Sequence, residues 1–198
     1  MWQSKGGTHH TTVLAVRRGD EVAIAGDGQV TVQDSVLKRT AVKVRTLYEN
    51  RVVAGFAGSV ADAITLFERF EGQLEKNNGQ LRKASVELAK QWRTDRALRR
   101  LEAWLVVADP DAILVLSGEG DVVEPDDDAV GIGSGGGFAL AAARALLAHT
   151  SFPAPEVARI SMEIAADICI FTNRHISVAS IKRGQEATVA AAGGSGTL

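Results

Sequence analysis

The chain has 198 residues, of which 45% are hydrophobic and 23% charged, and this is an ordinary mixture for a globular protein. Lysine and arginine total 22 against 24 aspartates and glutamates, without a basic cluster of the kind that follows phosphates. We therefore expect no nucleic-acid partner and no anionic membrane surface.

Cys169 is the only cysteine, which excludes an intramolecular disulfide and a cysteine-based zinc cage. A reducing compartment suits such a chain best. No apolar run approaches the roughly 18 residues that span a bilayer, and residues 1–10 lack the apolar stretch of a secretory signal. These features predict a cytoplasmic protein without a membrane anchor.

The first half of the chain begins with short strands and continues with two helices. Apolar residues alternate with turn signals and predict strands over 11–17, 21–25, 41–48 and 51–57. Ser59 is suited to cap a helix whose apolar residues recur at 3.6-residue spacing as far as Leu74. Asn77-Asn78-Gly79 ends this helix, and a second helix is predicted over 81–101.

The second half repeats this alternation of strands and paired helices. Strands are predicted over 103–108, 112–117, 122–123 and 129–132, helices over 138–149 and 155–172, and a last strand over 176–182. The turns between the strands are short enough for antiparallel neighbours. The pattern predicts an α+β fold of one domain: a four-layer αββα sandwich of two antiparallel sheets flanked by helix pairs. Residues 184–198, mostly Ala, Gly, Ser and Thr, are expected to form a disordered tail.

Four places carry residues of chemical interest: Thr11-Thr12, Asp27 between two glycines, Lys43, and the glycine loops around Gly58 and Ser134. Each has an ordinary explanation when taken alone. Threonine is common in strands, Gly-Asp-Gly is usually a turn, and a lysine in a strand usually lies at a solvated edge.

Taken in this order, the residues resemble the HslV (ClpQ) family of bacterial proteasome-like peptidases over residues 11–178. The matching stretches are TTVLAV from Thr11, AGDGQVT from Ala25, VKVR from Val42, AGFAGSVADAITLFE from Ala54, ELAKQWRTDRALRRLEA from Glu87, IGSGG from Ile132 and DICIFTN from Asp167. The resemblance implies the N-terminal nucleophile hydrolase fold and a threonine-type endopeptidase, the core of an ATP-dependent degradation complex.

The same resemblance implies the assembly and the maturation of the protein. Family members form a homo-dodecamer of two stacked hexameric rings, are allosterically controlled, and receive unfolded proteins from the hexameric ATPase HslU. Residues 1–10 would be a leader that is removed, leaving a peptidase domain over 11–183. Because His9 and His10 stand in this segment, a disordered tail or a cloning remnant is the alternative explanation of it.

Thr11 would be both nucleophile and base once it becomes the first residue. An α-amine has a pKa of about 7.7–8, so a useful fraction is neutral near pH 7 and able to take the proton of the hydroxyl. The resemblance places Lys43 beside Thr11, where its ammonium would lower the pKa of this amine. Asp27 would keep Lys43 charged and oriented, because an unpaired buried charge is costly.

Two further residues are assigned supporting roles by the resemblance. The backbone N–H of Gly58 would stabilise the oxyanion that forms when the carbonyl is attacked. Ser134 would orient the Thr11 amine or a water, although a loop serine that caps the next helix is an equally good interpretation.

No cofactor is expected for the chemistry itself. By resemblance, the backbone oxygens of Ala166, Cys169 and Thr172, which are three residues apart at a predicted helix end, hold a monovalent cation such as sodium. Cys169 also fits the simpler description of a small buried hydrophobic residue.

The sequence offers two alternatives to this function, a dinucleotide-binding protein and a non-catalytic ring subunit. Gly131, Gly133 and Gly136 satisfy the G-x-G-x-x-G pattern of dinucleotide sites, but a second helix follows instead of a crossover to a parallel strand. No P-loop motif is present, so ATP hydrolysis must come from a partner. A non-catalytic ring subunit of the same architecture would lack Thr11, Asp27 or Lys43, and all three are present.

Overall fold

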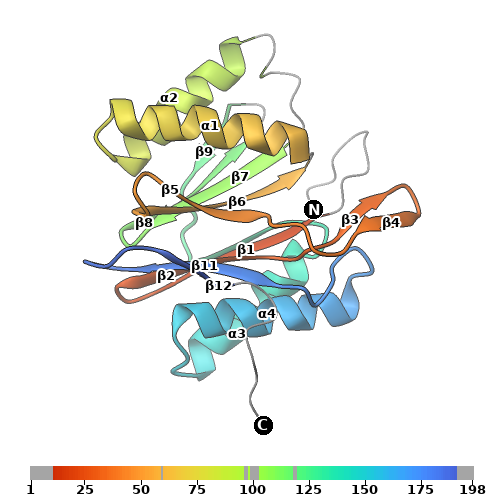
Figure 1. The fold of residues 1–198 in the computed structure, drawn as a ribbon. Coiled ribbons are helices and arrows are strands. Elements are labelled where there is room, and N and C mark those ends of the chain that lie inside the picture. The colour runs from red at the N-terminus through yellow and green to blue at the C-terminus, as the bar shows by residue number, and fades with distance from the viewer. Residues whose placement is uncertain (1–10, 59, 96–97, 99–102, 118–119, 191–198) are drawn as a thin grey trace.

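Two five-stranded antiparallel sheets lie face to face at the centre of the described part of the chain (Figure 1). The computed structural model describes residues 11–58, 60–95, 98, 103–117 and 120–190. The first sheet has the strand order β10 (Ala129–Gly133), β1 (Thr12–Arg18), β2 (Glu21–Gly26), β11 (Ser177–Lys182) and β12 (Thr188–Ala190). The second follows chain order, with β5 (Val44–Leu47), β6 (Val52–Gly58), β7 (Ala103–Asp109), β8 (Ala112–Ser117) and β9 (Val122–Val123).

A pair of helices covers the outer face of each sheet. Helices α1 (Val60–Lys76) and α2 (Leu81–Thr94) lie over the second sheet, and α3 (Gly136–His149) and α4 (Ala154–Ile168) lie over the first (Figure 1). A small hairpin, β3 (Val30–Val32) and β4 (Ser35–Lys38), projects from the end of the sandwich (Figure 1). The predicted αββα arrangement is therefore confirmed.

Strand β1 shows why the central strands are apolar on both faces. Its side chains alternate, so that Val13 and Ala15 join the core between the two sheets while Leu14 and Val16 join the core under α3 and α4. All four are fully buried. A strand covered on both faces reads as a continuous apolar run, which is what the sequence shows here.

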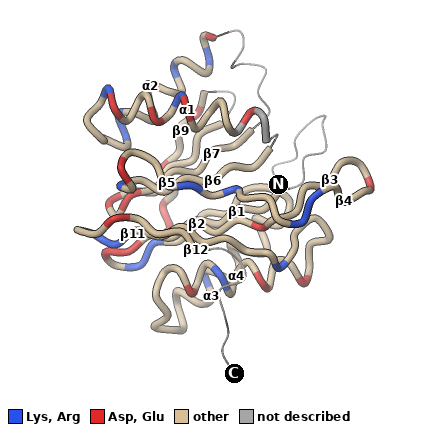
Figure 2. Tube along the Cα trace, viewed as in Figure 1, with Lys and Arg blue, Asp and Glu red and all other residues tan. Residues whose placement is uncertain are grey.

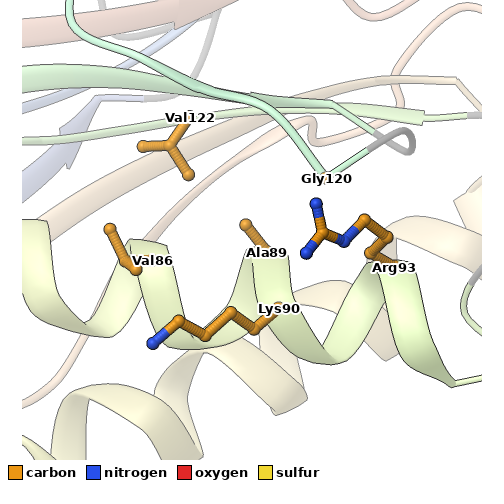
Figure 3. Close-up of a pocket in the computed structure, with 6 residues that line it drawn as sticks. All are labelled: Val86, Ala89, Lys90, Arg93, Gly120 and Val122. Atoms are coloured by element: carbon orange, nitrogen blue, oxygen red, sulfur yellow. The ribbon is translucent and has the colours of Figure 1, made fainter.

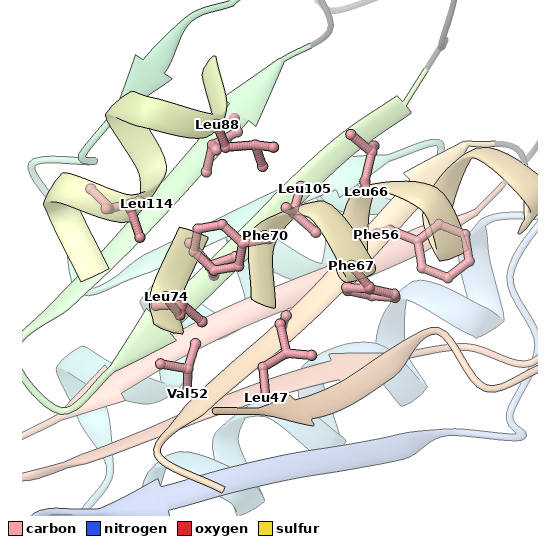
Figure 4. Close-up of a cluster of buried hydrophobic side chains, with 14 of the residues drawn as sticks. Leu47, Val52, Phe56, Leu66, Phe67, Phe70, Leu74, Leu88, Leu105 and Leu114 are labelled. Atoms are coloured by element: carbon pink, nitrogen blue, oxygen red, sulfur yellow. The ribbon is translucent and has the colours of Figure 1, made fainter. Parts of the chain in front are cut away.

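The outer core over the second sheet depends on one face of α1. Leu66, Phe70 and Leu74 recur every four residues, are fully buried, and pack with Leu105 and Leu114 of the sheet (Figure 4). Burial of an aliphatic or aromatic side chain of this size contributes about 1.5–3 kcal/mol. The 3.6-residue spacing seen in the sequence is therefore what fixes this helix to the sheet.

Both long helix predictions overran the true C-termini. Helix α2 ends at Thr94, because Asp95 has extended backbone angles, and most of the remaining predicted stretch lies outside the described residues. Helix α4 ends at Ile168 instead of Thr172. Tertiary hydrogen bonds explain this second difference. The Thr172 hydroxyl bonds to that of Thr12 in β1, and the Asn173 N–H donates to Asp27, which follows β2.

Two short strand regions were not predicted. The β3–β4 hairpin has strands of only three and four residues, and although Val30, Val32, Val36 and Leu37 are apolar, its side chains are largely exposed and do not form the longer pattern of a buried strand. In the tail that was expected to be disordered from residue 184, β12 pairs antiparallel with β11, Val178 being opposite Ala190. Ala187 is also buried there. The expectation is thus wrong for this strand, because pairing with a ready sheet edge supplies bonds that composition does not reveal; residues 191–198 lie outside the described range.

Candidate active site

Thr11 immediately precedes strand β1 and is buried, with 4% of its surface exposed. Its carbonyl oxygen accepts a hydrogen bond of 2.9 Å from the backbone N–H of Ser134. The expected leader, residues 1–10, lies outside the described residues. The structure therefore places Thr11 and Ser134 together, as the sequence interpretation required.

Asp27 and Lys43 form a buried ion pair that connects the two sheets. Asp27 directly follows β2 of the first sheet, and Lys43 directly precedes β5 of the second. The Nζ of Lys43 lies 2.7 Å from Oδ1 of Asp27, and it also donates to the carbonyl of Gln29 at 2.5 Å. Both charged side chains are almost completely withdrawn from solvent. This contact is the geometry that the predicted orienting role of Asp27 requires.

The carboxylate of Asp27 also receives bonds from the main chain around it. Oδ1 accepts the N–H of Thr12 at 3.0 Å, while Oδ2 accepts the N–H of Gln29 at 2.8 Å and that of Asn173 at 3.4 Å. These donors satisfy lone pairs of a carboxylate that has no access to water. One oxygen thus contacts both the lysine and the residue that follows Thr11.

Burial lowers the pKa of Lys43 below the ordinary lysine value, while the charge and the hydrogen bond of Asp27 act in the opposite direction. The ammonium is therefore a stronger acid than a surface lysine. A cation at this position favours the neutral form of a nearby amine.

The turn at Asp27 requires glycine for a steric reason. A Cβ on Gly28 would lie 2.4 Å from the backbone oxygen of Arg39. The same turn is fastened by Asn173, whose Oδ1 accepts the Gly28 N–H at 3.1 Å and whose Nδ2 donates to the Arg39 oxygen at 2.9 Å. Asn173 was not singled out in the sequence, although it ends the DICIFTN stretch.

The glycine run after β10 packs against the start of β1. Gly133 has φ +83°, and a Cβ there would lie 1.8 Å from the carbonyl oxygen of Thr11. Gly135, and not Ser134, occupies the N-cap position of α3. Strand β10 pairs antiparallel with β1, and α3 leads directly to α4. Gly133 thus packs closely against Thr11, and an antiparallel strand pair followed by two helices is not the βαβ unit of a dinucleotide site.

Gly58 is the last residue of β6, and α1 begins two positions later at Val60. Its φ of +139° lies in a region that other residues rarely adopt. The preceding residue, Ala57, has its Cβ 3.5 Å from where a Cβ on Gly133 would lie. The end of β6 thus lies near the glycine run that contacts Thr11.

The three residues expected to hold a cation are not all in the helix. Ala166 lies in the last turn of α4, Cys169 is its C-cap, and Thr172 lies in the following turn. The Cys169 oxygen accepts the Thr172 N–H at 3.0 Å and retains a second lone pair. Carbonyls at a helix end lack intrahelical partners, so the donor set is compatible with a monovalent cation. Among the described residues, His, Cys, Asp and Glu side chains form no group of three that could hold a metal ion.

A pocket of about 200 Å³ lies elsewhere, between α2 and the segment leading into β9 (Figure 3). It is lined by Val86, Ala89, Lys90, Arg93, Gly120 and Val122, none of which is a candidate site residue. Lys90 is paired with Glu87. We assign no function to this pocket.

Basic and acidic positions are interspersed along the trace in the view of Figure 2. In the described ranges, no helix has the length and apolar character needed to cross a membrane.

The chain is similar to known proteins both in sequence and in structure. Residues 8–181 match the family profile described as proteasome subunit. The crystal structure of the eukaryotic HslV from Trypanosoma brucei is 49% identical in sequence, with a TM-score of 0.83, and the match covers 87% of this chain and 100% of that one. The similarity thus extends over nearly the whole described sandwich.

Proposed function

The chain belongs to the proteasome family as an HslV-type threonine peptidase, and from this membership we propose that Thr11 is its nucleophile. The protein is accordingly the proteolytic core of an ATP-dependent protease. The observation that carries the assignment to Thr11 is its buried position immediately before Thr12, whose N–H bonds to the Asp27 oxygen that Lys43 also contacts. Thr12, the next residue, bonds to Asp27 through its backbone N–H, but its own hydroxyl is engaged by Thr172.

The reaction needs Thr11 to be the first residue. Before cleavage its nitrogen is an amide and does not accept a proton, whereas the freed α-amine does. The hydroxyl then transfers its proton to this amine while Oγ1 bonds to the substrate carbonyl carbon. The resulting ammonium protonates the departing amine of the substrate, and water hydrolyses the ester with the amine again as base.

Lys43 and Gly58 would stabilise the charges that develop in these steps. The Lys43 ammonium lowers the pKa of the amine, so that more of it is neutral at pH 7. The Gly58 N–H donates to the oxyanion, and loss of such a donor typically costs about 10²- to 10³-fold in rate. Ser134, already bonded to Thr11 through its backbone, would orient the amine or the hydrolytic water with its hydroxyl.

HslV-type peptidases act as stacked-ring oligomers with an ATPase partner. For this chain we propose two stacked hexameric rings, the hexameric unfoldase HslU as the partner, and unfolded proteins as substrates. We further propose allosteric activation by that partner and a cytoplasmic location. The backbone oxygens of Ala166, Cys169 and Thr172 would hold a sodium ion that ties the end of α4 to the loop after it.

The decisive experiment combines intact mass with covalent labelling. We expect the mature protein to have lost residues 1–10 and to be acylated on Thr11 by a peptide β-lactone. The Thr11→Ala variant should not be labelled. A fully active sample that retains His10 joined to Thr11 would refute the mechanism, and an assembled but unlabelled wild-type protein would identify a non-catalytic subunit.

A further inference from the structure

After the leader is lost, Thr11 is a chain end, and chain ends are poorly ordered unless they are tied down. We propose that the buried hydroxyl pair of Thr12 and Thr172 is a positioning device that fixes Thr11 for catalysis. This inference rests on the proposed role of Thr11. It concerns side chains that take no part in the chemical steps described above.

The two hydroxyls are in direct contact although they are 160 positions apart in the sequence. Oγ1 of Thr12 lies 2.6 Å from Oγ1 of Thr172, and the first residue is fully buried while the second is 4% exposed. The Thr12 oxygen also accepts the N–H of Gly135 at 2.9 Å. The side chain of Thr12, the first residue of β1, is thereby held from two sides.

The main chain of Thr12 is fastened as well. Its N–H donates to Oδ1 of Asp27 at 3.0 Å, and its carbonyl accepts the Asp27 N–H at 3.3 Å. Thr12 is thus bound by the turn after β2, by the glycine run before α3 and by the loop after α4. Because Thr12 is fixed by three separate segments, the peptide bond that joins it to Thr11 has little freedom to move.

The space around the hydroxyl pair is closed. A Cβ on Gly135 would lie 2.6 Å from Oγ1 of both Thr12 and Thr172, so even one methyl group does not fit there. The hydroxyls face away from the Thr11 side chain, because neighbouring residues of a strand point to opposite faces. The pair therefore acts through the backbone of Thr12 and does not touch the substrate.

Loosening this anchor should reduce the rate more than the binding of substrate. A misplacement of about 1 Å at the reacting atoms costs on the order of 10²-fold in rate. The substrate-binding surface is not formed by the pair, so KM should change little. The acidic limb of the pH profile should also shift, because the Thr11 amine would move relative to the Lys43 ammonium.

The test replaces each hydroxyl with a methyl group of the same shape and then restores it. Thr172→Val and Thr12→Val should lower kcat about 10- to 100-fold with KM within about twofold, while Thr172→Ser and Thr12→Ser should stay within about threefold of wild type. Because both Val changes break the contact between the hydroxyls, the double variant should lose little more than Thr12→Val alone, which also loses the bond from Gly135. Acylation of Thr11 by the β-lactone should slow without a lower final stoichiometry.

Ser161→Ala is the matched control. Ser161 is a fully buried residue of α4, and among the described atoms its hydroxyl has no hydrogen-bond partner. This variant should keep the kcat and pH profile of wild type. If Thr172→Val is not recovered folded, Thr172→Ala tests the same hydroxyl with a smaller side chain.

Two results would overturn the positioning role: Val variants with the kcat and pH profile of wild type, or Ser variants as impaired as the Val variants. A wild-type protein that the β-lactone does not label at Thr11 would instead overturn the proposed nucleophile. The two failures are therefore distinguishable.

Discussion

Lys43 and Asp27 form an ion pair 2.7 Å long in which the lysine side chain is 1% exposed and the aspartate side chain is fully buried. Withdrawing two charges from water costs several kcal/mol per ion, and the attraction between them often does no more than offset this cost. Such a pair is therefore weak evidence for stability. Its position beside the start of β1 is better explained by a chemical role.

Removing one partner of this pair should be more damaging to stability than removing both. Lys43→Met or Asp27→Asn should lower the free energy of unfolding by about 3–5 kcal/mol for the charge left unpaired, whereas the double variant should recover much of this loss. All three should lack peptidase activity. Urea unfolding and peptide hydrolysis measure the two effects.

The exposed pair of Arg82 and Glu124, 2.6 Å long, is the control for that experiment. Arg82→Ala should change the free energy of unfolding by no more than about 1 kcal/mol and leave activity intact. A double variant of Lys43 and Asp27 less stable than either single variant would contradict the interpretation of the buried pair.

The pH profile of kcat/KM should be bell-shaped. On the acidic side activity rises as the Thr11 amine loses its proton, at a pKa that Lys43 holds below the ordinary 7.7–8 or so. On the alkaline side activity falls as Lys43 loses its charge, and because the pKa of Lys43 is lowered by burial, this limb should begin below pH 10.5.

Stability should respond to Lys43 in the opposite direction. The unfolded chain holds the lysine proton up to a higher pH than the folded protein, so the contribution of Lys43 to stability rises between its pKa in the folded protein and the ordinary lysine pKa of 10.5. The difference in urea midpoint between wild type and the Lys43→Met, Asp27→Asn double variant isolates this contribution. A difference that does not change across this range would show that Lys43 keeps an ordinary pKa.

Gly133→Ala should abolish activity by displacing Thr11. The new Cβ would overlap the Thr11 carbonyl oxygen, and φ +83° is unfavourable for alanine, so the strand start must move. A loss of at least about 10²-fold in kcat is expected. Gly137→Ala is the matched control, since a Cβ there meets nothing within 4 Å and alanine favours a helix. Equal effects of the two changes, measured by peptide hydrolysis, would contradict the close packing described here.

Thr11→Ala should remove peptide hydrolysis while the oligomer forms as in wild type, because the side chain takes part in chemistry and not in the sandwich core. Thr11→Ser should retain part of the activity, since it keeps both the hydroxyl and the amine. Light scattering and peptide hydrolysis are the measurements. Turnover by purified Thr11→Ala protein would show that another residue is the nucleophile.

The sequence interpretation was most accurate where the pattern is local. The spacing of Leu66, Phe70 and Leu74 is a property of one segment, and it correctly predicted a helix packed on a sheet. Strands were not predicted where the apolar pattern is short and the side chains are exposed, as in the hairpin of β3 and β4. Strand β12 was missed for another reason, since only the edge of β11 makes it a strand.

The candidate site divides in the same way. Thr11, Asp27, Lys43 and Ser134 were named from the sequence because their motifs resemble a family, and the structure brings all four to one region. Thr172 was named only for its backbone oxygen. Its hydroxyl, which holds Thr12, had no signal in the sequence.

On its own, the sequence determined the layers, the paired helices and the identity of the chemical groups. The reason is that the hydrophobic periodicity and the motifs involve residues close together in the chain. The tertiary structure alone decided where α4 stops, which donors share the carboxylate of Asp27, and how Thr12 meets a residue 160 positions away. The physical reason is that a buried polar atom must find its partner wherever the fold brings one, and distance along the chain does not reveal that partner.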